Sequence, residues 1–123
     1  MPIVDIEIVV RAGESVGHGR AAEIAERAGE IFESQKGGTW VKIRTIPWEY
    51  YAESGANAND EVLPVFVSIL KAHLPKADAM KAEVSSLTEA IAKICAREPE
   101  NVHIIYEPGA AGRVAFGGTV VEG

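Results

Sequence analysis

The sequence opens with MPIVDIEIVV (residues 1–10), and the similar stretch LPVFVSILKA occupies residues 63–72. Each stretch carries a proline at its second position, followed by β-branched and apolar residues that favour a β-strand. In the first stretch Asp5 and Glu7 alternate with apolar residues. We therefore expect a strand over residues 3–10 with at least one buried face.

Both stretches are followed by the same order of patterns. After the first, apolar residues recur at steps of three and four, which predicts an amphipathic helix that ends at Gly37 and Gly38. Its apolar positions are Ala21, Ile24, Ala25, Ala28, Ile31 and Phe32. A second strand is expected over residues 40–46, with Lys42 and Arg44 on one face.

The second half of the chain repeats this order. Residues 65–70 predict a strand, and a helical stripe follows that ends at Glu98 and Pro99. The stripe consists of Met80, Val84, Leu87, Ile91, Ile94 and Cys95. Residues 102–106 predict the last long strand.

The two halves match at nearly constant offsets. An offset of 62 pairs Pro2 with Pro64, and an offset of 61 pairs Val41 with Val102. We interpret the chain as a tandem duplication of a β-α-β unit, in which each crossover is right-handed and its two strands are parallel. The alternative is a chance similarity between the two β-α-β units of one ferredoxin-like domain.

This interpretation gives one domain, residues 1–123, made of two pseudo-repeats. The first covers about residues 1–51 and the second about residues 63–118. The polar, Gly- and Asn-containing segment 52–62 is the natural connection between them.

Composition narrows the class of protein. Hydrophobic residues make up 47% and charged residues 24%, as in a globular domain, and the net charge of −6 argues against a nucleic-acid surface. No apolar run approaches the roughly 20 residues of a membrane span, and the start of the chain lacks the pattern of a signal peptide. With a single cysteine, Cys95, no internal disulfide can form, and we expect a soluble cytoplasmic protein.

The proline after the initiator methionine has a possible chemical role. Methionine before a small residue is usually removed, which would leave Pro2 with a secondary amine. Burial and nearby cations would lower the pKa of that amine, and an amine tuned in this way can act as a general base. Pro64 is internal and has no proton to exchange. The alternative is that Pro2 simply starts an edge strand.

MPIVDIEIVV, the β-α-β order and VHIIYEPGAAGRVAFGG (residues 102–118) together resemble the tautomerase superfamily, specifically the 4-oxalocrotonate tautomerase branch in a fused, two-unit form. The resemblance implies an α+β fold, with a mixed sheet carrying two helices on one face, and a homotrimer with pockets between subunits. It also implies a cofactor-independent keto–enol tautomerase that acts on a small unsaturated 2-oxo or 2-hydroxy carboxylic acid. No cofactor is expected.

The family pattern transfers to this sequence residue by residue. Pro2 matches the catalytic amino-terminal proline. Arg11 falls one residue short of the family arginine that ends the first strand and binds a substrate carboxylate. Through the internal repeat, Arg11 corresponds to His73, and Lys71 lies close by.

A second family arginine is replaced in both halves of this chain. Its position holds Lys42 in the first half and His103 in the second, and Arg44 lies on the face of Lys42. Because lysine and histidine suit a carboxylate less well than the fork of arginine, the replacement weakens the case for a dicarboxylate substrate. The resemblance to fused members implies that Pro2 is partnered by the second-half cations Lys71, His73, His103 and Arg113, and that Arg11, Lys42 and Arg44 line the corresponding place around Pro64. The sequence does not decide which set surrounds Pro2, and both sets stay open.

Other functions remain as alternatives. Dehalogenases and decarboxylases of the superfamily use a protonated proline, and the hydrolytic ones add an acidic residue, for which Asp5, Glu7 and Glu107 are candidates. A non-catalytic binding module with this fold is the other possibility, since a fold does not guarantee activity. No metal site is expected, because the spacing of the three histidines, His18, His73 and His103, is unlike that of metal ligands.

Overall fold

A four-stranded sheet with two helices forms the body of the protein. The computed structural model describes residues 2–55 and 62–123, so most of the predicted connection 52–62 lies outside the described residues. The elements in chain order are β1 (Ile3–Val10), α1 (His18–Phe32), β2 (Trp40–Pro47), β3 (Val65–Leu70), α2 (Ala77–Cys95) and β4 (Val102–Tyr106), followed by the short strands β5 (Ala115–Phe116) and β6 (Thr119–Val120). One-turn 3₁₀ helices, Trp48–Tyr50 and Pro99–Asn101, follow β2 and precede β4.

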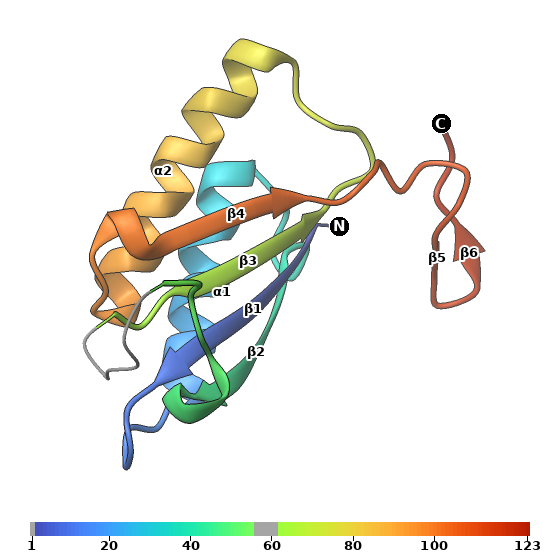
Figure 1. Ribbon diagram of the computed structural model, residues 1–123. Coiled ribbons are helices and arrows are strands. Elements are labelled where there is room, and N and C mark those ends of the chain that lie inside the picture. The colour runs from blue at the N-terminus through green and yellow to red at the C-terminus, as the bar shows by residue number, and fades with distance from the viewer. Residues whose placement is uncertain (1, 56–61) are drawn as a thin grey trace.

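The sheet has the strand order β2-β1-β3-β4. β1 is parallel to β2 and β3 is parallel to β4, whereas the central strands β1 and β3 are antiparallel. Figure 1 shows both helices on the same face of this sheet, while the β5–β6 hairpin lies beyond the end of β4. The hairpin contacts the start of β2, because the rings of Phe116 and Trp40 meet edge to face with their centroids 5.4 Å apart. The prediction of an α+β fold with a mixed sheet and two helices on one face is confirmed.

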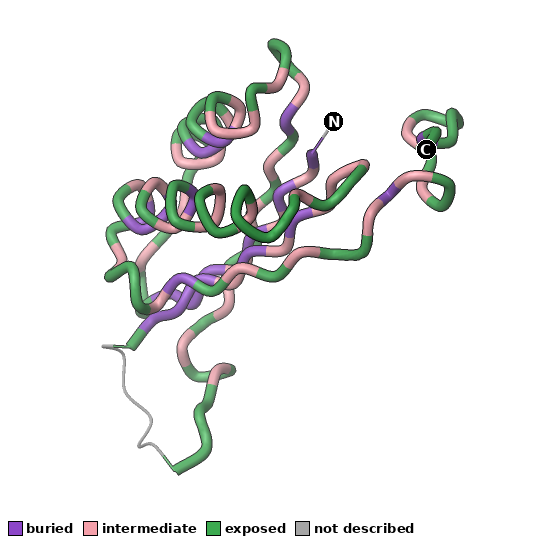
Figure 2. The backbone as a smooth tube through the Cα atoms, turned by 90° about the horizontal axis from the view of Figure 1, so that it is seen from above, coloured by how far each residue is buried: buried purple, intermediate pink, exposed green. Residues whose placement is uncertain are grey.

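The core lies between the sheet and the helices. Alternate residues of the central strands point toward the helices, and in Figure 2 the buried positions gather along these strands. The buried strand residues include Val4, Ile6, Ile8, Val65, Val67 and Ile69, and those of the helices include Ile24, Ala28, Leu87 and Ile91. On the opposite face Trp40 and Ile105 are exposed.

Both helices end earlier than predicted, because a residue other than glycine takes the left-handed conformation. Glu33 ends α1 with a φ of 55°, and Ala96 ends α2 with the same φ. The N–H of Ser34 then donates to Gly29 O at 2.9 Å, as expected for this kind of cap. The prediction that Gly37 and Gly38 end the first helix is wrong, since they belong to the turn before β2.

The strand registers correct the internal alignment. Val4 pairs with Val41 and Val65 pairs with Val102, so the two parallel pairs have the same spacing. An offset of 61 maps Val4 onto Val65, and both side chains are buried in the core. An offset of 62 would map Val4 onto Phe66, on the opposite face of the sheet, because strand side chains alternate.

The predicted equivalence of Pro2 and Pro64 is therefore wrong by one residue. In the offset that preserves the faces, Leu63 corresponds to Pro2, and Pro64 corresponds to Ile3. Pro64 thus sits one residue further along its strand than Pro2 does.

Candidate active site

Pro2 is buried immediately before the central strand β1. Its carbonyl accepts a hydrogen bond of 2.9 Å from the N–H of Trp40. The next residue, Ile3, pairs with Trp40 on one side and with Leu70 on the other. Continuing the antiparallel register by one residue brings Lys71 beside Pro2, on the face that carries the helices. β1 thus begins where β3 and β4 end, as Figure 1 shows.

Lys71 belongs to a cluster of polar side chains at this end of the sheet. Its Nζ donates to Glu83 Oε1 at 2.8 Å and lies 4.9 Å from the centre of the Phe32 ring. The hydroxyl of Tyr106 donates to the other carboxylate oxygen of Glu83. Burial, together with this hydrogen bond, raises the pKa of Tyr106, so the phenol remains a donor. Neither Glu83 nor Tyr106 was among the residues predicted from the sequence.

On the other side of Pro2 lies the connection between α1 and β2. The parallel register places Thr39 beside Pro2, and Thr39 is a buried polar residue whose Oγ1 is 2.7 Å from Ser34 Oγ. Lys36 is exposed in the same connection. The prediction missed Lys36, although parallel pairing of the first two strands implies that residues just before the second strand approach Pro2.

His73 and Arg113 lie near residues 108–110, which lead into the β5–β6 hairpin and which we call the hairpin neck. His73 is exposed in the connection after β3, and the backbone there is close to Gly109, where an added Cβ would lie 3.1 Å from Ala72 O. The N–H of Ala110 donates to Lys71 O at 2.8 Å. Arg113 donates from Nε to Gly109 O at 2.7 Å and from Nη2 to the carbonyl before it at 2.6 Å, so its guanidinium braces this neck.

Lys42 and Arg44 lie on the sheet face away from the helices, as a pair on one face, which the sequence predicted. Lys42 Nζ is 3.6 Å from Asp5 Oδ2, and Arg44 Nη1 is 3.0 Å from Asp5 Oδ1. Arg44 Nη2 is also 3.6 Å from Glu7 Oε2. Both cations are therefore paired with carboxylates of β1, on the opposite face from Lys71.

His103 also lies on the outer face, near the start of β4. Its ring is 5.6 Å from the ring of Phe66, which in turn lies 5.9 Å from Tyr51. Since β4 ends near Pro2, its first residues lie at the opposite end of the sheet. Within one chain the structure does not bring His103 to Pro2.

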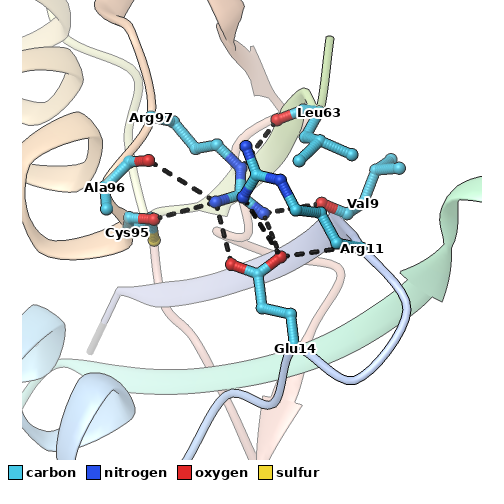
Figure 3. Close-up of polar contacts among 7 residues, drawn as sticks. All are labelled: Val9, Arg11, Glu14, Leu63, Cys95, Ala96 and Arg97. Atoms are coloured by element: carbon cyan, nitrogen blue, oxygen red, sulfur yellow. Dashed lines mark hydrogen bonds and ion pairs between the residues drawn. The ribbon is translucent and has the colours of Figure 1, made fainter. Parts of the chain in front are cut away.

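The Pro64 end of the sheet is closed by an arginine that the sequence analysis did not single out. The side chain of Arg97 is 4% exposed, and it donates to Leu63 O at 2.9 Å and to Val9 O at 2.8 Å (Figure 3). It also bonds both oxygens of Glu14, at 3.0 and 3.1 Å. This hydrogen bond is the main cause that lowers the pKa of Glu14. Arg11 lies at the same end, half exposed and 4.0 Å from Glu14.

Three surface pockets of the described chain involve α1, and the one beside the connection 33–39 includes Thr39, the register neighbour of Pro2. One is between the start of α1 and β2, one between the outer sides of the helices, and one beside the connection 33–39, and Pro2 lines none of these three. Within residues 2–55 and 62–123 no three His, Cys, Asp or Glu side chains are grouped to hold a metal ion. Over the same residues, no helix has the length and apolarity that crossing a membrane requires.

No protein-family model matches the sequence, and no curated protein does. Solved structures do match in fold. Macrophage migration inhibitory factor (MIF) from Oncomelania hupensis has a TM-score of 0.77 at 16% identity, covering 99% of this chain and 83% of that one. MIF2 of Leishmania major has a TM-score of 0.75 at 15% identity, covering 98% and 97%. A fused 4-OT solved as an asymmetric trimer has a TM-score of 0.67 at 16% identity, covering 94% of each chain. This protein therefore has the tautomerase-superfamily fold that MIF and fused 4-OT share.

Proposed function

We propose that this protein is a cofactor-independent keto–enol tautomerase acting on a small unsaturated 2-oxo or 2-hydroxy carboxylic acid, with the amine of Pro2 as general base. The observation that carries the proposal is the place of Pro2. It is buried at the head of a central strand, with Lys71 next to it in register, in a chain with the fold of MIF and 4-OT.

The chemistry requires one group that takes a proton and returns it. Once methionine is removed, the Pro2 nitrogen is a secondary amine, and burial disfavours its charged form, so a neutral base is available. The amine takes the proton of the enol hydroxyl as the carbonyl forms, and delivers a proton to the carbon at the far end of the conjugated system. A positioned base of this kind contributes about 10²- to 10⁴-fold to the rate.

The substrate carboxylate requires a cation beside Pro2. Lys71 is the cation that the register places there, and His73 and Lys36 are exposed in the connections at the same end. Four cations lie on the outer face of the sheet or at its opposite end, so they would reach Pro2 only if they belonged to a neighbouring chain. These are Arg11, Lys42, Arg44 and His103. We keep them as candidates for that role. Arg113, as the brace of the hairpin neck, has a structural role in this proposal.

We infer a homotrimer with the pockets at the subunit boundaries. The outer face of the sheet leaves Trp40 and Ile105 exposed, which suits an interface, and the fused 4-OT neighbour is a trimer. Light scattering on the purified protein tests this directly, and a monomer at micromolar concentration would contradict it. The compartment that we infer is the cytoplasm, since the single cysteine suits a reducing environment.

The decisive experiment combines intact mass with ketonisation of 2-hydroxymuconate or phenylenolpyruvate. We expect a mass short by one methionine and a loss of about 10²-fold or more in kcat/KM for Pro2→Ala. Pro64→Ala is the matched control, since it removes a buried proline before the other central strand without changing an amine. Retained methionine, or activity indifferent to Pro2→Ala, would contradict the proposal and favour a non-catalytic protein.

Hydrolytic dehalogenation is the less favoured chemistry, because two of the three candidate acids form ion pairs on the outer face, which leaves Glu107. Asp5 and Glu7 pair with Lys42 and Arg44 on the outer face, and both oxygens of Glu83 are hydrogen-bonded. Turnover of halogenated acrylates without turnover of the enols would reverse this preference.

A further inference from the structure

We propose that Glu83 is a positioning residue that, with Tyr106, holds the ammonium of Lys71 beside Pro2 to receive the substrate carboxylate. This inference rests on the proposed function and extends it to two residues outside the family pattern. Lys71 is the binding residue, and Glu83 and Tyr106 act through it.

Four elements converge on the Lys71 ammonium. Lys71 follows β3, Glu83 lies on α2, Tyr106 ends β4, and Phe32 ends α1. The side chains of Lys71 and Glu83 are 19% and 12% exposed, with Nζ and Oε1 2.8 Å apart. The ammonium is therefore held by an ion pair and by the face of an aromatic ring, with Nζ 4.9 Å from the ring centre.

A lysine needs such restraint before it can orient a ligand. Its ammonium is a point charge on a flexible four-carbon stem, and fixing that stem costs side-chain entropy. Tyr106 in turn fixes the carboxylate of Glu83 by donating to the oxygen that Lys71 does not use. The ion pair of Lys71 and Glu83 therefore already has its binding geometry before the substrate arrives.

Stability alone does not explain this pair. A partly buried ion pair gains little over apolar residues of similar volume, because both charges lose water. Arg97 at the other end of the sheet shows what a purely structural cation looks like. It is 4% exposed, and its Nε, Nη1 and Nη2 atoms all donate to carbonyls or to Glu14.

Lys71 differs from Arg97 in that Glu83 accepts from only one of the three N–H bonds of its ammonium. A second N–H can face the Phe32 ring, whose centre is 4.9 Å from Nζ. The remaining N–H belongs to a side chain that is still partly exposed, in the register position next to Pro2. Cross-strand neighbours on one face have Cβ atoms about 5 Å apart, so the stem of Lys71 begins beside Pro2.

The test compares steady-state kinetics of Lys71→Met, Glu83→Gln and Tyr106→Phe. We expect KM to rise about tenfold or more in the first, about three- to tenfold in the second and less in the third, with kcat changed less than KM. Glu30→Gln is the matched control, because Glu30 forms an exposed helix pair with Arg27 at 4.0 Å, and its KM should not change. Variants that melt at lower temperature with an unchanged KM would overturn the proposal in favour of a structural role.

Binding of phenylpyruvate by calorimetry separates this proposal from the failure of the proposed function. If the wild type binds phenylpyruvate without turning over its enol, the tautomerase assignment fails. The positioning role then stands if Lys71→Met and Glu83→Gln weaken binding and Glu30→Gln does not. Equal binding by all four proteins, or none by the wild type, overturns the positioning role.

Discussion

Replacing Arg97 by methionine should remove a large part of the stability of this fold. The guanidinium joins α2 to both central strands through Leu63 O at 2.9 Å and Val9 O at 2.8 Å, and it pairs with Glu14 at 3.0 Å. Methionine keeps most of the stem but removes the guanidinium donors to these carbonyls and to the Glu14 carboxylate, which is 18% exposed and retains the N–H of Arg11 at 3.0 Å. Breaking a buried pair from one side costs about 3–5 kcal/mol, against about 5–15 kcal/mol for a whole domain.

Urea unfolding at one fixed protein concentration measures this loss, because assembly would add to apparent stability. Arg27→Met is the control: its side chain is 51% exposed and its ion pair spans 4.0 Å, so it should cost no more than about 0.5 kcal/mol. Combining Arg97→Met with Glu14→Gln should cost less than the two single changes together, since they share one interaction. A loss of about 1 kcal/mol or less for Arg97→Met, or strict additivity with Glu14→Gln, would refute the reasoning.

Three further predictions concern neighbouring features. Arg97 lowers the folded-state pKa of Glu14 below 4.5, so the stability that Glu14 contributes should be fully present above pH 4.5 and lost as the pH falls through the lower folded pKa. The urea midpoints of the wild type and Glu14→Gln should therefore converge in acid. A difference between the two midpoints that persists in acid would contradict this prediction. Ala96→Gly should stabilise the chain by about 0.5–1 kcal/mol, because Ala96 has a φ of 55°; a lower melting temperature would count against it. Burial raises the pKa of the Cys95 thiol, so a thiol reagent should modify it slowly in the native protein and rapidly in urea, and equal rates would show the thiol to be accessible.

The strands were predictable because their signal is local. Alternation of apolar and polar residues predicted β1, β3 and β4 with their observed bounds, and β2 is one residue longer than predicted. The helix ends were not predictable in this way, since Glu33 and Ala96 adopt a conformation that usually selects glycine. Both side chains are exposed, and a single sequence does not record which residue takes that conformation.

The candidate site was predictable only in part. Pro2 and Lys71 follow from the strand register once the central strands are known to be antiparallel. Glu83 and Arg97 were missed, because their partners Tyr106 and Val9 lie 23 and 88 residues away in sequence. A charged residue on a helix or just after its end usually faces solvent, so nothing in the local pattern distinguishes these two.

The one-residue shift between Pro2 and Pro64 limits what a circular permutation of this chain could achieve. A circular permutant starting at Pro64 would expose a second proline amine, but in the register position of Ile3 rather than of Pro2. There the residue is already part of the ladder, with Pro64 O accepting from Val9 N at 3.0 Å, and Arg97 fills the adjacent space. Placing a proline amine in the register position of Pro2 in the second half would take a proline at position 63, a new chain start and the loss of Arg97 together. The two halves thus differ in a way that no single substitution reverses.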